Sequence, residues 1–168
     1  MAERLAHIDF EHLLEFFPQI ELPATIGEDT FEAFSQNNEP LPVRIIAQFI
    51  QPTEPDEIDE SVTEYVSCFA LPPADHYAGI VYWRAGLLDY QYVLLTLDPR
   101  TEEMIDRRVI AGTTVVDGEL VQSSCAISED LLIYIVSGQG RLDGYDYSAA
   151  RSTANRFQVT ERGKIVEL

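Results

Sequence analysis

Histidine is the side chain best suited to acid–base or metal chemistry near neutral pH, and the sequence contains three. His7 and His12 are five residues apart, which misses the i, i+4 spacing that places two metal ligands on one helix face. His76 follows Asp75 where two β-type segments meet, and a turn position accounts for it better than a catalytic one. An enzyme that combines carboxylates with His76 is therefore the weakest functional hypothesis.

The serines, cysteines and glycines form none of the usual catalytic or cofactor motifs. The serines at 123–124 and Ser137 lack a G-x-S-x-G elbow. Cys68 and Cys125 have no C-x-x-C spacing and no histidine nearby, so they are predicted to be reduced and buried. The glycines of 138–144 are wrongly spaced for a dinucleotide or phosphate loop, and a hairpin or surface loop is predicted there. No cofactor and no metal site is expected, and the interpretation leans away from an enzyme.

An acidic, proline-containing segment at residues 51–64 is the first candidate binding site. Its carboxylates resemble the ligands of a hard cation, but the D-x-D-x-D-G framework of a calcium loop is missing. Prolines and mutually repelling acids predict an exposed hinge, which is either simply solvated or offered to a basic partner. The candidate residues are Glu54, Asp56, Glu57, Asp59 and Glu60.

The second candidate site is an aromatic stretch between Tyr77 and Tyr92. Tyrosine, tryptophan and arginine are the residue types that dominate binding hot spots. Strand alternation predicts Tyr82 and Arg84 on one face of a sheet and Trp83 on the other. These three residues are candidate binding residues, and the stretch either packs the core, contacts a protein or lines a small-molecule pocket.

The same stretch carries a resemblance to a group of known sequences. Residues 81–98 read VYWRAGLLDYQYVLLTLD, followed by IAGT at 110–113, an apolar segment at 129–136 and GKIV at 163–166. This pattern resembles a family of bacterial proteins without an assigned function. The resemblance implies a bacterial origin and a sheet-rich fold for the C-terminal part of the chain, and it implies no site residue.

Short helices are predicted to make up most of residues 1–50. Apolar residues recur at i, i+3, i+4 and i+7 between Phe10 and Phe17, which is one stripe of a helix that Pro18 ends. A second short helix is predicted over 27–38. The third covers 40–50, with proline in its first turn, although its β-branched residues leave a strand as the alternative.

Beyond residue 64 the pattern changes to short segments rich in Val, Ile, Tyr, Phe and Leu. The turns between them are too short for crossover helices, so consecutive strands should pair antiparallel. The predicted strands are 65–71, 77–84, 90–97, 104–111, 120–127, 131–136, 156–160 and 164–168. The predicted fold class is α+β, with short N-terminal helices packed on a large twisted antiparallel sheet, a meander, in one domain spanning 1–168.

Negative charge is concentrated near the N-terminus of this acidic chain, whose formal net charge is -18. Residues 1–64 hold 15 acids and 2 arginines, a net of -13, and the remaining residues hold 14 acids and 9 bases, a net of -5. Such a field repels nucleic acid and anionic membranes and favours a basic partner. With no visible secretory signal and no long apolar segment, a cytoplasmic location is expected.

Three functional hypotheses follow. The first is a non-enzymatic protein-binding module, of the immunity or antitoxin type, that offers an acidic surface to a basic protein. The second is a small-molecule-binding or regulatory protein with an aromatic pocket. The third is the hydrolase-like enzyme built on carboxylates and His76, and no motif in the sequence decides among them.

Overall fold

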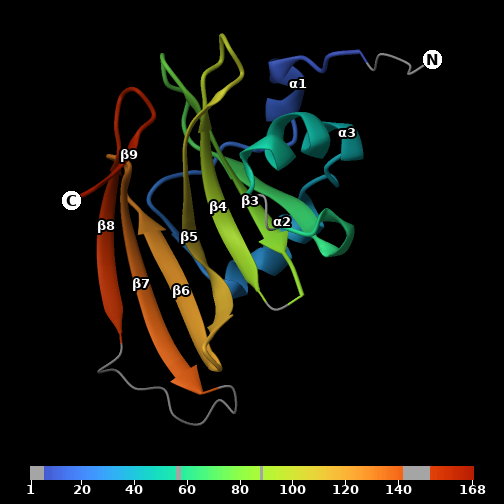
Figure 1. The fold of residues 1–168 in the computed structure, drawn as a ribbon. Coiled ribbons are helices and arrows are strands. Elements are labelled where there is room, and N and C mark those ends of the chain that lie inside the picture. The colour runs from blue at the N-terminus through green and yellow to red at the C-terminus, as the bar shows by residue number, and fades with distance from the viewer. Residues whose placement is uncertain (1–5, 56–57, 88, 142–151) are drawn as a thin grey trace.

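One antiparallel sheet runs through most of the chain, with short helical segments gathered beside its first strands (Figure 1). The computed structural model describes residues 6–55, 58–87, 89–141 and 152–168. Within these residues nine strands form the sheet, and eight of them lie side by side in sequence order from β2 to β9. The predicted α+β fold with a meander is therefore confirmed.

Every segment predicted as a strand is a strand, and neighbouring strands pair antiparallel. The strands are β1 (Ala24–Ile26), β2 (Glu64–Ala70), β3 (Ala78–Ala85), β4 (Tyr90–Leu97), β5 (Met104–Val116), β6 (Glu119–Ile127), β7 (Leu132–Arg141), β8 (Thr153–Val159) and β9 (Ile165–Glu167). The predicted loop at 138–144 is wrong for its first four residues, which extend β7 opposite β6. Glycine keeps its backbone N–H and C=O, so Gly138 and Gly140 continue the hydrogen-bonded ladder with β6. The rest of that loop lies outside the described residues.

The N-terminal region is built from single helical turns and short helices, as predicted. They are α1 (Phe10–Leu14), η1 (Glu28–Thr30), α2 (Phe31–Asn37), α3 (Val43–Ile45), η2 (Ile46–Ile50), η3 (Gln51–Thr53) and η4 (Glu60–Val62). The segment at 40–50 is thus helical, and the alternative of a strand is wrong because its apolar side chains face a sheet at helical spacing. None of these described helices is long and apolar enough to cross a membrane.

The long strand β5 bends and so turns one half of the sheet away from the other. Residues 104–113 of β5 pair with β4 and residues 112–116 pair with β6, and the ladder to β4 shifts register twice. Gly112 adopts a φ of 141°, and a Cβ there would lie 2.3 Å from the Tyr90 carbonyl oxygen. Only glycine tolerates this close approach of two backbones. Figure 1 shows the result, with β3 and β4 splayed away from β6, β7 and β8.

Both faces of the central strands are buried, and we call them the outer and inner faces. On the outer face α1, α3 and η2 cover β3 and β4 through Leu13, Ile45 and Phe49. This two-sided burial explains why β4 reads as a nearly continuous apolar run and does not alternate. The strand residues of the outer face are Ile80, Tyr82, Val93, Leu95 and Leu97.

The inner face is enclosed by the bend of the sheet, by α2 and by β1, which pairs with β6. Cys68 and Cys125 are buried here as free thiols, which agrees with the predicted role as small apolar residues. The turn between β8 and β9 closes one end, because Thr96 Oγ1 donates to the Gly163 carbonyl at 2.7 Å. Other members of this core are Val81, Leu94, Ile110, Ile127, Ile133 and Phe157.

Candidate functional site

The three candidate residues of the aromatic stretch divide between the two faces as predicted. Tyr82 and Arg84 are buried on the outer face, and Trp83 is half-buried on the inner face. Arg84 lies opposite Gln91 in the β3–β4 ladder, and Trp83 lies opposite Tyr92. Two different environments therefore share the same pair of strands.

A buried ionic network occupies the outer face, and it corrects one prediction. Glu54 was expected in an exposed hinge, but its side chain is only 1% exposed. One carboxylate oxygen accepts hydrogen bonds from the Tyr82 hydroxyl and, at 3.1 Å, from Arg107, and the other accepts from Arg84. The helical turns η2 and η3 carry Glu54 back over the sheet, where two guanidinium groups compensate the cost of burying its charge.

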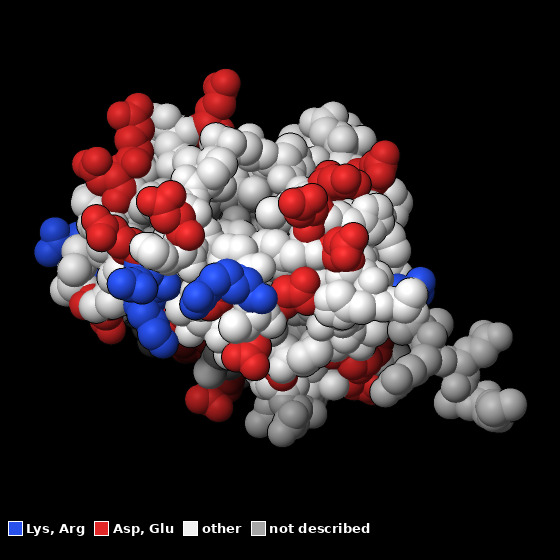
Figure 2. Space-filling view, turned by 90° about the horizontal axis from the view of Figure 1, so that it is seen from above, with Lys and Arg blue, Asp and Glu red and all other residues white. Residues whose placement is uncertain are grey.

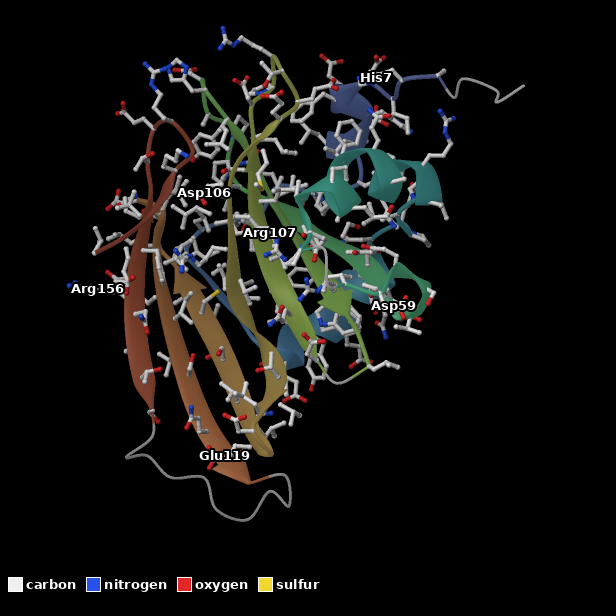
Figure 3. All side chains as sticks on the ribbon, in the orientation of Figure 1. His7, Asp59, Asp106, Arg107, Glu119 and Arg156 are labelled. Atoms are coloured by element: carbon white, nitrogen blue, oxygen red, sulfur yellow. The ribbon has the colours of Figure 1, made fainter. Side chains whose placement is uncertain are left out.

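The network continues along β3 and β4. Arg84 also donates to the side-chain oxygen of Gln91, and the Asp89 carboxylate lies 3.8 Å from the Arg84 guanidinium. Burial and the charge of Glu54 raise the pKa of Tyr82, so the phenol stays protonated and donates its hydrogen bond. Figure 3 labels Arg107 at the β4–β5 part of the sheet, from where it reaches Glu54. Its position indicates a role in holding the fold.

The other acids of the predicted hinge differ from Glu54. Asp59 and Glu60 are exposed, as expected, and Figure 3 shows Asp59 at the edge of the molecule. Asp59 accepts from the Ser61 N–H at 3.1 Å, while Glu60 accepts from the Tyr65 hydroxyl at 2.9 Å. Asp56 and Glu57 lie outside the described residues. The structure therefore does not bring the five predicted acids together as one surface.

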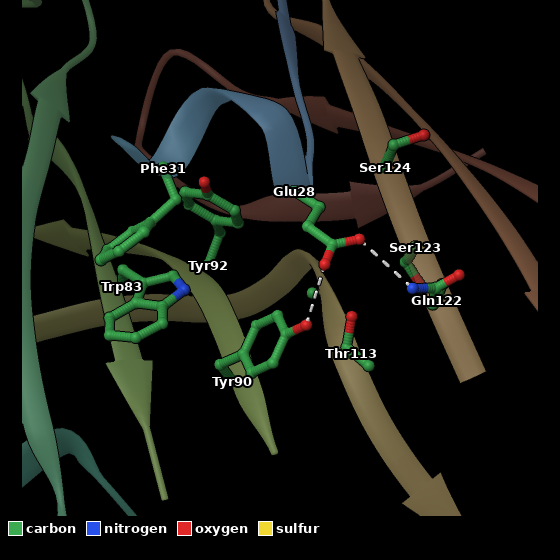
Figure 4. A pocket seen from close by; sticks show the side chains of 10 residues that line it. Glu28, Phe31, Trp83, Tyr90, Tyr92, Thr113, Gln122, Ser123 and Ser124 are labelled. Carbon is green, nitrogen blue, oxygen red and sulfur yellow. Dashed lines mark hydrogen bonds between the residues drawn. The ribbon is translucent and has the colours of Figure 1, made fainter. Parts of the chain in front are cut away.

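A cavity of about 420 Å³ opens on the inner face (Figure 4). The strands β3 to β6 form its floor, and η1 and α2 form one wall. Four of the ten lining residues are aromatic, and they gather on the side of β3, β4 and α2, with polar side chains toward β5 and β6. The lining residues are Glu28, Phe31, Trp83, Tyr90, Tyr92, Gly112, Thr113, Gln122, Ser123 and Ser124.

The buried Tyr92 fixes η1 above the sheet. Its hydroxyl donates to the Gly27 carbonyl at 3.0 Å and lies 3.2 Å from Thr30 Oγ1. Thr30 in turn accepts from the Gly27 N–H at 3.2 Å, which closes the turn on itself. Burial raises the pKa of Tyr92, so this donor is kept over the physiological range. Glu28 is thereby held at the rim of the cavity.

Three rings form the apolar wall. Phe31 stacks on Trp83 with centroids 4.0 Å apart and an interplanar angle of 29°. Tyr90 lies on the other strand with its centroid 5.9 Å from that of Trp83. Stacked rings of this kind stabilise each other and are stiff, so the wall exists before any ligand arrives.

The polar groups meet at the rim of the cavity. The Glu28 carboxylate accepts from the Tyr90 hydroxyl at 3.2 Å and from Gln122 Nε2 at 3.3 Å. In Figure 4 the indole nitrogen of Trp83 lies on the ring edge that faces Glu28 and Tyr90, and the Thr113 hydroxyl points toward Glu28. Within the described residues the indole N–H has no hydrogen-bond partner. The cavity thus offers both a donor and a carboxylate acceptor.

The histidines lie away from this cavity. His76 is exposed in the turn before β3, at the opposite end of that strand from Trp83. It lines a separate hollow with Asp75, Asp98, Arg100 and Arg162. His7 lies 2.6 Å from Glu102 and His12 lies 2.9 Å from Glu15. No group of three or more His, Cys, Asp or Glu residues within the described ranges could hold a metal ion.

Sequence reasoning missed much of the cavity. In the sequence Glu28 is only one residue of the short helix predicted over 27–38, and Ser123 and Ser124 are considered only as nucleophiles. Gln122 and Thr113 carried no signal, because their proximity depends on pairing between β5 and β6. The aromatic residues of 77–92 were the one usable signal. No protein-family model, curated protein or solved structure matches the chain, so its function has to be argued from this geometry.

Proposed function

We propose that this protein binds a small molecule in the cavity of the inner face. The observation that carries the proposal is an aromatic cavity of about 420 Å³ with convergent polar groups. Small-molecule sites combine these two features, and their volumes are typically about 300–1,000 Å³. The half-buried Trp83 lines this cavity with its ring and with an indole N–H that has no partner among the described residues.

The cavity favours binding over catalysis. Ser123 Oγ lies 2.8 Å from Ser137 Oγ, so its hydroxyl is engaged by another hydroxyl, and no described base contacts it. Glu28 is pinned by two neutral donors, Tyr90 and Gln122. A positioned carboxylate with neutral hydroxyl and amide neighbours orients a ligand well, but it offers no activated nucleophile.

The rigid surroundings support the same proposal. Tyr92 anchors η1, and Phe31 is stacked on Trp83, so little conformational entropy remains to be lost when a ligand enters. A cavity that is formed in advance converts more of its contact energy into affinity. This is the property expected of a binding protein or of the sensing part of a regulatory one.

A thermal-shift screen against a metabolite library tests this function. A ligand present at one hundred times its Kd should stabilise the fold by about 2.7 kcal/mol. Gln122→Phe fills the mouth of the cavity and should abolish the shift, whereas Ser35→Phe, which adds the same ring on the exposed face of α2 outside the cavity lining, should preserve it. A library without a hit, or a hit that both variants bind equally, contradicts the proposal.

A second candidate function is the binding of a basic protein by the acidic N-terminal region, as an immunity-type or antitoxin-like inhibitor would. Among the described residues of 6–64, Glu54 has arginine partners and the other carboxylates have no lysine or arginine partner. Figure 2 shows acidic side chains spread over the face seen from above, where they outnumber the basic ones. Uncompensated charge of this kind steers association with a basic surface.

Affinity capture at low and at high salt tests this second function. A basic protein should bind at low salt, be released at high salt, and be lost when Glu11 and Glu15 of α1 are both changed to lysine. Both carboxylates are exposed, so the changes should leave the fold intact. The absence of any salt-sensitive basic protein would contradict it.

A further inference from the structure

We infer that the ligand of the cavity is an organic cation, an alkylated ammonium group held against the aromatic wall. This inference rests on the proposed small-molecule function and names the class of ligand. It depends on three features of the cavity, which are its ring geometry, its carboxylate and the placement of basic residues elsewhere.

Phe31 is stacked on one face of Trp83, so a cation in the cavity can contact only the rest of the indole, together with the ring of Tyr90. The centroids of Phe31 and Tyr90 lie 4.0 Å and 5.9 Å from that of Trp83. A cation is attracted by an aromatic ring within about 6 Å of its centroid, and tryptophan is the strongest of the three ring types. A methylated ammonium group suits such a wall, because its weak hydration makes removal from water less costly.

The carboxylate of Glu28 gives the cavity its negative end. Tyr90 and Gln122 hold it by neutral hydrogen bonds, and within the described residues it has no lysine or arginine partner. Asp29 follows it in the exposed turn η1 and adds charge of the same sign. The Glu28 side chain is exposed, and among the described residues its negative charge is left uncompensated at the cavity rim.

The three described arginines of β3 and β5 that lie nearest in the sheet, Arg84, Arg107 and Arg108, contact other groups. Arg84 and Arg107 lie on the outer face, bound to Glu54. Arg108 shares the inner face with the cavity, but its guanidinium lies 4.3 Å from the centroid of the Phe157 ring. The described lining of the cavity contains no lysine, arginine or histidine. An anionic ligand would meet repulsion here, and a cation would meet attraction.

The single tryptophan of the sequence makes a direct test possible, because Trp83 emission reports on the cavity alone. The probes are choline, tetraethylammonium and the uncharged analogue of choline in which carbon replaces the ammonium nitrogen, all at matched ionic strength. At least one cation should change the emission saturably, and choline should bind at least about tenfold more tightly than its uncharged analogue.

Two variants separate the local carboxylate from the general charge of the protein. Glu28→Gln should weaken cation binding by about threefold or more and leave the uncharged analogue unaffected. Glu32→Gln removes the same charge from the exposed face of α2, outside the cavity lining, and should change neither. An equal effect of the two variants would overturn the role of Glu28.

The outcomes distinguish this inference from the function on which it rests. If the uncharged analogue binds as tightly as choline, or if only neutral or anionic compounds from the metabolite library bind in the cavity, the inference is wrong and the binding function stands. If no probe and no library compound changes the emission or the thermal stability, both are wrong.

Discussion

Replacing Glu54 with glutamine should destabilise the protein severely, although the change is nearly isosteric. The carboxylate is the acceptor for Tyr82, Arg84 and Arg107, whose hydrogen bonds it receives at both oxygens. The Arg84 and Arg107 side chains are only 7% and 17% exposed, so water cannot replace the lost counter-charge. Removing one partner from a buried ion pair costs about 3–5 kcal/mol, and we expect a loss in that range.

Glu60→Gln is the matched control. Glu60 lies six residues further along the chain, carries the same charge and also accepts hydrogen bonds, from Tyr65 and Gln51. It is exposed, and interactions of exposed carboxylates contribute about 0–1 kcal/mol. The two substitutions change the net charge of the protein equally, so any difference between them reports on burial.

Equilibrium unfolding in urea, followed by circular dichroism, measures both variants. With an m-value of about 2 kcal/mol/M, a loss of 3–5 kcal/mol lowers the unfolding midpoint by about 1.5–2.5 M. The control should shift it by less than about 0.5 M. If the two variants unfold within about 0.5 M of each other at equal m-values, the reasoning about the buried network is refuted.

A double-mutant cycle tests what causes the loss of stability in Glu54→Gln. If the cost of Glu54→Gln arises from stranded guanidinium groups, then Arg84→Met should cost less in the Glu54→Gln background than in the wild-type protein. A coupling free energy of about 1–3 kcal/mol is expected for groups in direct contact. Additive effects would mean that Glu54 and Arg84 contribute independently.

The remaining predictions concern the backbone, the thiols and the tyrosines. Gly112→Ala should lower the free energy of unfolding by about 3 kcal/mol, because it adds a backbone clash to the strain of a positive φ. Gly118→Ala is the control, since Gly118 has a φ of 76° and nothing lies within 4 Å of the added methyl group. It should cost about 1 kcal/mol in the same urea assay. Cys68 and Cys125 should resist a thiol reagent at pH 8 and react once urea unfolds the protein, since burial raises the pKa of both thiols, that of Cys125 to about 12. Reaction of either native thiol within minutes would contradict this. Burial and Glu54 raise the pKa of Tyr82 in the folded state, so its contribution to stability is complete below its unfolded pKa of about 10 and is lost as the pH rises further. The urea midpoint of unfolding, measured from pH 8 to 11, should therefore decrease once the pH exceeds about 10. The midpoint of Tyr82→Phe should decrease less steeply over the same range.

The order and pairing of the strands could be predicted from the sequence because short turns leave few alternatives. Segments joined by reversals such as 98–101 and 161–163 have no room for a crossover, so neighbours in sequence become neighbours in the sheet. The bend in β5 could not be predicted in this way. It depends on Gly112 meeting the backbone of Tyr90, a contact that exists only once β4 and β5 are paired.

The candidate sites were harder to predict than the fold for a physical reason. The composition of 51–64 indicates solvent exposure for all its acids, and Glu54 departs from this because Arg84 and Arg107 reach it from strands 30 and 53 residues away in sequence. Glu28 similarly meets Gln122 across 94 residues. Local composition measures the average cost of burying a charge, while the partner that offsets this cost is supplied by the tertiary structure.

The two environments on β3 and β4 depend on each other through strand alternation. Arg84 and Gln91 form a ladder pair on the outer face, and their hydrogen-bonded side chains hold these strands in register. The neighbouring pair, Trp83 and Tyr92, points to the inner face and forms the cavity wall. A slip of one residue would exchange the two sets, placing the arginine against the aromatic wall and the indole against Glu54. The buried ionic network therefore does more than stabilise the outer face, because it specifies the register that gives the cavity an aromatic and uncompensated acidic lining.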